Sequence, residues 1–82
     1  MNNKNVSIEN ELIDYIKNIL PESKQQINIS SDTDLKNELY LDSFTFAELY
    51  FYIQDKYNVN LVGQKIDKYT PNVLASLIVK NM

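Results

Sequence analysis

One serine is the side chain in this sequence best placed to carry chemistry. Ser43 follows Asp42 in the stretch ELYLDSFTFAELYFYI, residues 38 to 53, and directly precedes apolar residues at helical spacing. A serine at the start of a helix sits where backbone N–H groups and the helix dipole favour an attached anion. A phosphate ester on Ser43 is therefore electrostatically well placed.

The chain lacks the groups that would let this hydroxyl act as a nucleophile by itself. It contains no histidine and no cysteine, which removes the usual base of a nucleophilic serine, a thiolate nucleophile and the commonest metal ligands. We therefore expect no catalytic residue, no metal site and a protein that is not an enzyme. Ser43 is better suited to being modified by another protein.

Acidic charge is concentrated around Ser43. From Asp32 to Asp55 six acidic residues stand against one lysine, Lys36, a net charge of −5 compared with −3 for the whole chain. All eight basic residues are lysines, so the paired contacts that arginine makes to phosphates and guanine are absent. We expect no nucleic acid partner, and the charge favours a partner with a basic surface. The alternative interpretation is a solvated acidic loop.

The elements that position Ser43 are predicted to be helices. Apolar residues recur at helical spacing in the first segment, and we predict a helix over residues 7 to 20, capped by Ser7 and stopped by Pro21. Residues 21 to 41 form a long connection, which we expect to be held on the core by its three leucines, Leu35, Leu39 and Leu41.

The second helix is predicted from Ser43 to Tyr57, with Asp42 or Ser43 as its N-cap. A brief third helix is expected around Gln64 to Tyr69. The last helix has the clearest start signal, because Thr70 is a good N-cap and Pro71 suits the first helical position.

These patterns indicate one all-α domain over residues 1–82, a small four-helix bundle of three main helices and one short helix. No segment sustains the alternation of a strand, and no run approaches the roughly 18 apolar residues that a membrane span needs. We expect a cytoplasmic monomer that does not bind membranes.

The second helix is predicted to be apolar on two sides. Its core stripe comprises Phe46, Leu49, Tyr50, Ile53 and Tyr57. The opposite side, which we call the partner face, comprises Phe44, Ala47, Glu48, Phe51 and Asp55. Two phenylalanines bordered by acids favour a docking surface. The alternative is that both rings fold against the long connection or the short helix.

The stretch DTDLKNELYLDSFTFAELYFYIQDKYNVNL, residues 32 to 61, resembles the acyl carrier proteins and their peptidyl and D-alanyl carrier relatives. It is similar to the loop, the D-S-[LFM] signature and the second helix of that family, with matching apolar spacing. The helix order, the long first connection and the terminal YTPNVLASLI extend the resemblance to the whole chain.

The resemblance implies an acyl-carrier-like bundle in which a phosphopantetheinyl transferase attaches 4′-phosphopantetheine from coenzyme A to Ser43. The thiol of this arm would carry an acyl group as a thioester and supply the sulfur that the chain lacks. Asp42 matches the acidic residue that orients the transferase encounter and helps with its magnesium ion. Four residues of the partner face match helix positions that the family presents to transferases, ketosynthases, acyltransferases and other acyl-processing enzymes: Phe44, Ala47, Glu48 and Phe51.

Two features depart from the family's pattern, and a third resembles one of its branches. Tyr40 stands where many members have glycine, so we expect a differently shaped turn and a large ring beside the arm. Lys56 stands where an acid is common, which argues against a primary role in fatty acid synthesis. The TPN sequence that enters the last helix resembles the D-alanyl carriers.

Three functions are compatible with these observations. The first is a carrier that presents acyl thioesters to the enzymes of a polyketide or fatty-acid-like pathway. The second is an aminoacyl or peptidyl carrier, including the D-alanyl type, which an adenylating enzyme would load. The third, of another class, is an unmodified helical adaptor that binds a partner through the second helix and uses Ser43 only as a cap.

Overall fold

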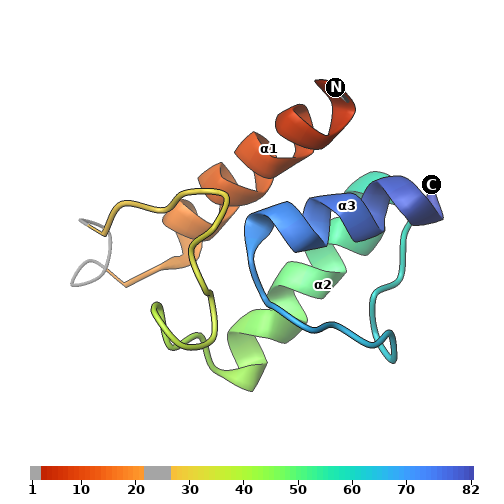
Figure 1. Cartoon of the computed structure of the whole chain (residues 1–82). Coiled ribbons are helices and arrows are strands. Elements are labelled where there is room, and N and C mark those ends of the chain that lie inside the picture. Colours follow the sequence, from red (N-terminus) through yellow and green to blue (C-terminus); the bar gives the residue numbers. More distant parts are fainter. Residues whose placement is uncertain (1–2, 22–26) are drawn as a thin grey trace.

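The computed structural model describes residues 3–21 and 27–82 of the chain. These residues form three helices and no strand: α1 (Asn3–Ile19), α2 (Ser43–Tyr57) and α3 (Pro71–Asn81) (Figure 1). The helix α1 packs against α3. The start of α1 and the end of α3 lie at one end of the molecule, and the start of α2 lies at the opposite end (Figure 1). The all-α class is confirmed, as is a small helical bundle.

The core is built from one apolar stripe of each helix together with residues of the connections. On α1 the buried residues recur every four positions, as expected for one face of a helix. Both connections add to the same core. In the described residues its buried apolar members are Ile8, Leu12, Ile16, Leu20, Ile29, Leu35, Leu39, Leu49, Ile53, Val59, Leu61, Leu74, Ala75 and Ile78. Burial of Leu35 and Leu39 confirms that the long connection is held on the core by its leucines.

Backbone hydrogen bonds join the long connection to the start of α3. Leu35 N–H donates to the Tyr69 carbonyl at 2.7 Å, and Asn72 N–H donates to the Ser31 carbonyl at 3.0 Å. Thr70 caps α3 because its hydroxyl accepts a bond from Val73 N–H, and Pro71 is the first helical residue. The predicted start of this helix is confirmed.

The first helix begins earlier than predicted. Its first residue is Asn3, and Ser7 lies inside the helix rather than at its cap. The early turns lie against α3, where Asn5 Nδ2 donates to Ser76 Oγ at 3.3 Å. Because contact with α3 supports these turns, the helix extends past Ser7 to Asn3.

The predicted short helix over residues 64 to 69 is wrong. Those residues are irregular, because their backbone groups bond elsewhere: Gln64 N–H closes a turn onto the Leu61 carbonyl at 3.2 Å, and Leu35 donates to Tyr69. Thr70, which precedes a proline, is extended with φ −117° and ψ 153°, as the proline ring requires. The bundle therefore has three helices in the described residues, not four.

Within the described part of the chain, no helix combines the length and the apolar character needed to cross a membrane.

Candidate functional site

The start of α2 is capped by Asp42 and not by Ser43. Asp42 has extended backbone angles, and its Oδ1 accepts a hydrogen bond from Thr45 N–H at 2.8 Å. Ser43 is the first residue of the helix, and its side chain is exposed. Because a different side chain makes the capping bond, the Ser43 hydroxyl is not needed for the cap.

A tight turn delivers the chain to this point. The Asp34 carboxylate accepts N–H groups from Asn37 and Lys36, each at 2.9 Å, and the bonds from Asn37 are the main reason that the pKa of Asp34 is lowered. The turn ends at Tyr40, whose φ of 55° lies in the left-handed region. Leu41 N–H then donates back to the Leu35 carbonyl at 3.1 Å.

A groove lies beside Ser43, between α2 and the irregular segment of residues 58–70. Its volume is about 470 Å³, within the range of roughly 300–1,000 Å³ that is usual for small-molecule sites. Leucines and three aromatic rings give it mostly apolar walls, and the lining includes Leu41, Phe46, Tyr50, Leu61 and Tyr69.

Lys36 brings a positive charge to the same groove. Its Nζ lies 5.6 Å from the centre of the Tyr69 ring, within cation–π distance. Tyr69 in turn meets Phe46 edge-on, with ring centres 5.1 Å apart. Burial raises the pKa of Tyr50, and the neighbouring Tyr69 side chain raises this pKa further. The groove therefore combines aromatic walls, tyrosine hydroxyls and one lysine.

All members of the partner face are exposed on α2. Phe44 and Phe51 are each 72% exposed, so neither is buried by the described part of the long connection or by the segment of residues 58–70. Glu48 and Asp55 lie on the same exposed side. An exposed pair of aromatic rings bordered by carboxylates fits a partner surface that is apolar at its centre and basic around it.

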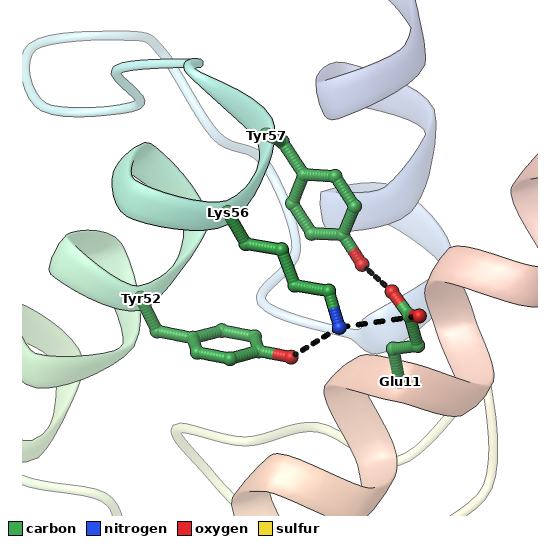
Figure 2. Close-up of polar contacts among 4 residues, drawn as sticks. All are labelled: Glu11, Tyr52, Lys56 and Tyr57. Atoms are coloured by element: carbon green, nitrogen blue, oxygen red, sulfur yellow. Dashed lines mark hydrogen bonds and ion pairs between the residues drawn. The ribbon is translucent and has the colours of Figure 1, made fainter.

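The other side of α2 is joined to α1 by aromatic and polar contacts. The rings of Tyr15 and Tyr52 stack with centres 4.0 Å apart and planes 10° apart. Figure 2 shows Lys56 beside Glu11, with 3.2 Å between Nζ and Oε1, and it also shows Lys56 donating to the Tyr52 hydroxyl at 3.3 Å. Lys56, one of the departures from the carrier pattern, thus has a contact within the fold.

Few of the site residues predicted from the sequence line the groove. Ser43 and Ala47 line the groove, whereas Phe44, Glu48 and Asp55 are not among its lining residues. Sequence reasoning missed the groove positions of Lys36 and Tyr69. Lys36 did carry one signal, because it is the one lysine between Asp32 and Asp55, but its place over Tyr69 depends on the packing of two distant loops.

Comparison with known proteins assigns the chain to a family. Neither the curated proteins nor the solved structures give a significant match to the chain. One family model matches residues 5–81, which is nearly the whole chain. The protein therefore belongs to the family described as "Protein of unknown function (DUF1493)".

Proposed function

We propose that this protein is an acyl carrier protein with a phosphopantetheine arm on Ser43, serving the enzymes of a polyketide or fatty-acid-like pathway. The observation that supports this most is the exposed Ser43 side chain at the first position of α2, where Asp42 supplies the cap. The proposal extends to the fold, with α1, α2 and α3 as the three main helices of an acyl-carrier-like bundle. The arm, when bound, supplies the thiol that the chain lacks.

The backbone at the start of α2 is suited to an anion on Ser43. Thr45 N–H donates to the Asp42 side chain and Phe46 N–H donates to the Asp42 carbonyl. In the described first turn of α2, the N–H groups of Ser43 and Phe44 can therefore donate hydrogen bonds to a phosphate ester on Ser43. The helix dipole adds a favourable field at the same place.

The groove offers a surface along which a chain attached to Ser43 can lie. Its apolar walls begin at Ser43 and continue past Ala47 to Tyr50. Such walls favour burial of methylene or aromatic carbon, and the gain is roughly 25 cal/mol for each Å² of apolar surface removed from water. We propose that the groove partly shields the attached acyl group between visits to enzymes.

We propose that pathway enzymes bind the partner face, which places Ser43 close to their active sites. Phe44 and Phe51 supply aromatic anchors, and Glu48 and Asp55 favour approach of a basic surface. No residue of this chain needs to act on the thioester itself. The contribution of the protein is to hold the acyl group near an active site, where tethering raises its effective concentration.

Intact mass measurement tests the proposal directly. The chain is incubated with coenzyme A and a broad-specificity phosphopantetheinyl transferase, in parallel with Ser43→Ala and with the control Ser7→Ala, which changes an exposed serine of α1. We expect one added arm on the native chain and on Ser7→Ala, and none on Ser43→Ala.

Addition to Ser43→Ala, or no addition to the native chain, would contradict the carrier function. In that case the exposed rings of Phe44 and Phe51 would remain as a reason to test the chain as an unmodified adaptor. For a chain that does gain the arm, the loading enzyme identifies the subclass. Loading by an acyltransferase indicates an acyl carrier, and loading by an adenylating enzyme indicates an aminoacyl or peptidyl carrier.

A further inference from the structure

The groove beside Ser43 adjoins a second, smaller hollow along α2. Ala47, Tyr50 and Val62 line both of them, and the smaller hollow, of about 160 Å³, also has Phe51 in its wall. The lining residues that α2 contributes recur at helical spacing, so they share one side of the helix. The two hollows therefore form one path along α2 from Ser43 to Phe51.

This path is as long as the proposed 4′-phosphopantetheine arm. From phosphorus to sulfur the arm is a single chain of thirteen bonds, which spans about 15 Å when extended to the same degree as a polypeptide. Gln54, the last α2 residue in the wall of the smaller hollow, follows Ser43 at a rise of about 16 Å along the helix axis. An extended arm on Ser43 that follows both hollows thus places its sulfur beside Phe51 and Gln54.

Lys36 gives the Ser43 end of the path a positive charge. It lines the larger groove together with Ser43 and does not line the smaller hollow. The bond from Leu41 N–H to the Leu35 carbonyl, at 3.1 Å, holds the neighbour of Lys36 in the chain close to the start of α2. The Lys36 ammonium lies over the Tyr69 ring at 5.6 Å, inside the groove. A phosphodiester is a permanent anion, which a lysine can bind as a point charge.

We infer that Lys36 pairs with the phosphodiester of the arm on Ser43, and that the resting arm lies along α2 with its sulfur in the smaller hollow beside Phe51. The inference rests on the proposed function, to which it adds a binding residue and a position for the arm. An acyl group on the sulfur then lies next to Phe51, a member of the partner face. A partner enzyme that covers Phe51 therefore meets the thioester end of the arm and not its phosphate.

Nuclear magnetic resonance of the isotope-labelled chain, before and after enzymatic loading of the arm, tests this placement. The readout is the shift of the Gly63 and Gln64 amide signals, because both residues line the groove and are distant from Ser43 in the sequence. We expect the arm to shift them in the native chain and in the control Lys17→Gln, which removes an exposed lysine of α1. Lys36→Gln should lose at least half of these shifts, whereas Lys36→Arg keeps the charge and should retain them.

Two further measurements examine the two ends of the arm. Raising the salt concentration to about 1 M screens an exposed ion pair, so we expect it to reduce the arm-induced shifts of the native chain toward those of Lys36→Gln. Nuclear Overhauser contacts should join the methylene protons next to the sulfur to the side chains of Phe51 and Gln54. Lys36 is exposed, so its substitutions should leave the fold intact, which the spectra before loading check.

Each contrary result has a distinct meaning. Equal arm-induced shifts in Lys36→Gln and the native chain would overturn the role of Lys36, whose charge would then act only on Asp34 and the Tyr69 ring. Shifts confined to the residues around Ser43 would overturn the resting position of the arm. Both of these results leave the carrier function standing. If the chain gains no arm, the proposed function fails and the inference fails with it.

Discussion

The Tyr57 hydroxyl donates a hydrogen bond to Glu11 Oε2 and so joins the last residue of α2 to the middle of α1 (Figure 2). The other oxygen of the same carboxylate pairs with Lys56 at 3.2 Å. The bond from Tyr57 is the main reason that the pKa of Glu11 is lowered, and Lys56 lowers this pKa further. Burial, followed by the bond to Glu11, raises the pKa of Tyr57. These contacts anchor the end of α2 that is farther from Ser43.

Removing the Tyr57 hydroxyl should weaken this junction without disturbing the core. Tyr57→Phe removes a hydrogen bond to a charged group at a partly exposed site, which we expect to cost about 1 kcal/mol in the free energy of unfolding. For a domain of this size, that loss lowers the melting temperature by about 4–8 °C. Circular dichroism during heating measures it, with Glu9→Gln on the same helix as the control. An unchanged melting temperature would show that the bond contributes nothing.

The stability of the junction should decrease in acid. Because the pKa of Glu11 is below its ordinary value of 4.5 in the folded state, its contribution is present above that value and is lost as the pH falls through the folded-state pKa. Urea unfolding of the native chain and of Glu11→Gln between pH 3 and pH 7 measures this. We expect Glu11→Gln to be the less stable of the two at pH 7 and the difference to shrink toward pH 3. A difference that does not change with pH would refute the role of the ionised carboxylate.

Asp42 should contribute to stability through its cap and to modification through its charge. Asp42→Ala removes the bond to Thr45 N–H, which we expect to cost about 0.5–2 kcal/mol. Asp42→Asn keeps an acceptor oxygen and should unfold close to the native temperature. If the charge orients the transferase, Asp42→Asn will still slow arm transfer. Transfer at the native rate by this stable variant would restrict Asp42 to the role of a cap.

Phe51 should be dispensable for folding and needed for partners. Phe51 is 72% exposed, so we expect Phe51→Ala to change the free energy of unfolding by no more than about 0.5 kcal/mol. We expect the same variant to lower kcat/KM for transfer to a partner enzyme by about fivefold or more. Ile53→Ala is the matched control on the same helix, because Ile53 is fully buried and its truncation should cost about 2–5 kcal/mol. A large loss of stability in Phe51→Ala would place Phe51 in the core.

The sequence predicts α2 and α3 well because their starts are set locally. Asp42 and Thr70 accept bonds from N–H groups three residues further along, and such capping patterns can be read without knowledge of the fold. Periodicity likewise identifies Leu49 and Ile53 as core residues. By contrast, the state of residues 64 to 69 depends on a bond from Leu35 to Tyr69. Local pattern contains no information about such a distant partner.

The groove could not be predicted for the same reason. Tyr50 belongs to the core stripe by its position on the helix, and yet it lines an open groove because the segment of residues 58–70 passes beside it. The partner face, in contrast, needs only the period of one helix. Its exposure follows from the position of its members opposite Leu49 and Ile53, which are both fully buried.

The start of α1 and the end of α3 share one end of the molecule, opposite the start of α2 (Figure 1). A purification tag, a fluorescent label or a second protein joined at either terminus therefore stands away from Ser43. The molecule can be immobilised or fused by its ends while the serine remains reachable for enzymes in solution. Assays with surface-bound protein are accordingly practicable in either orientation of the chain.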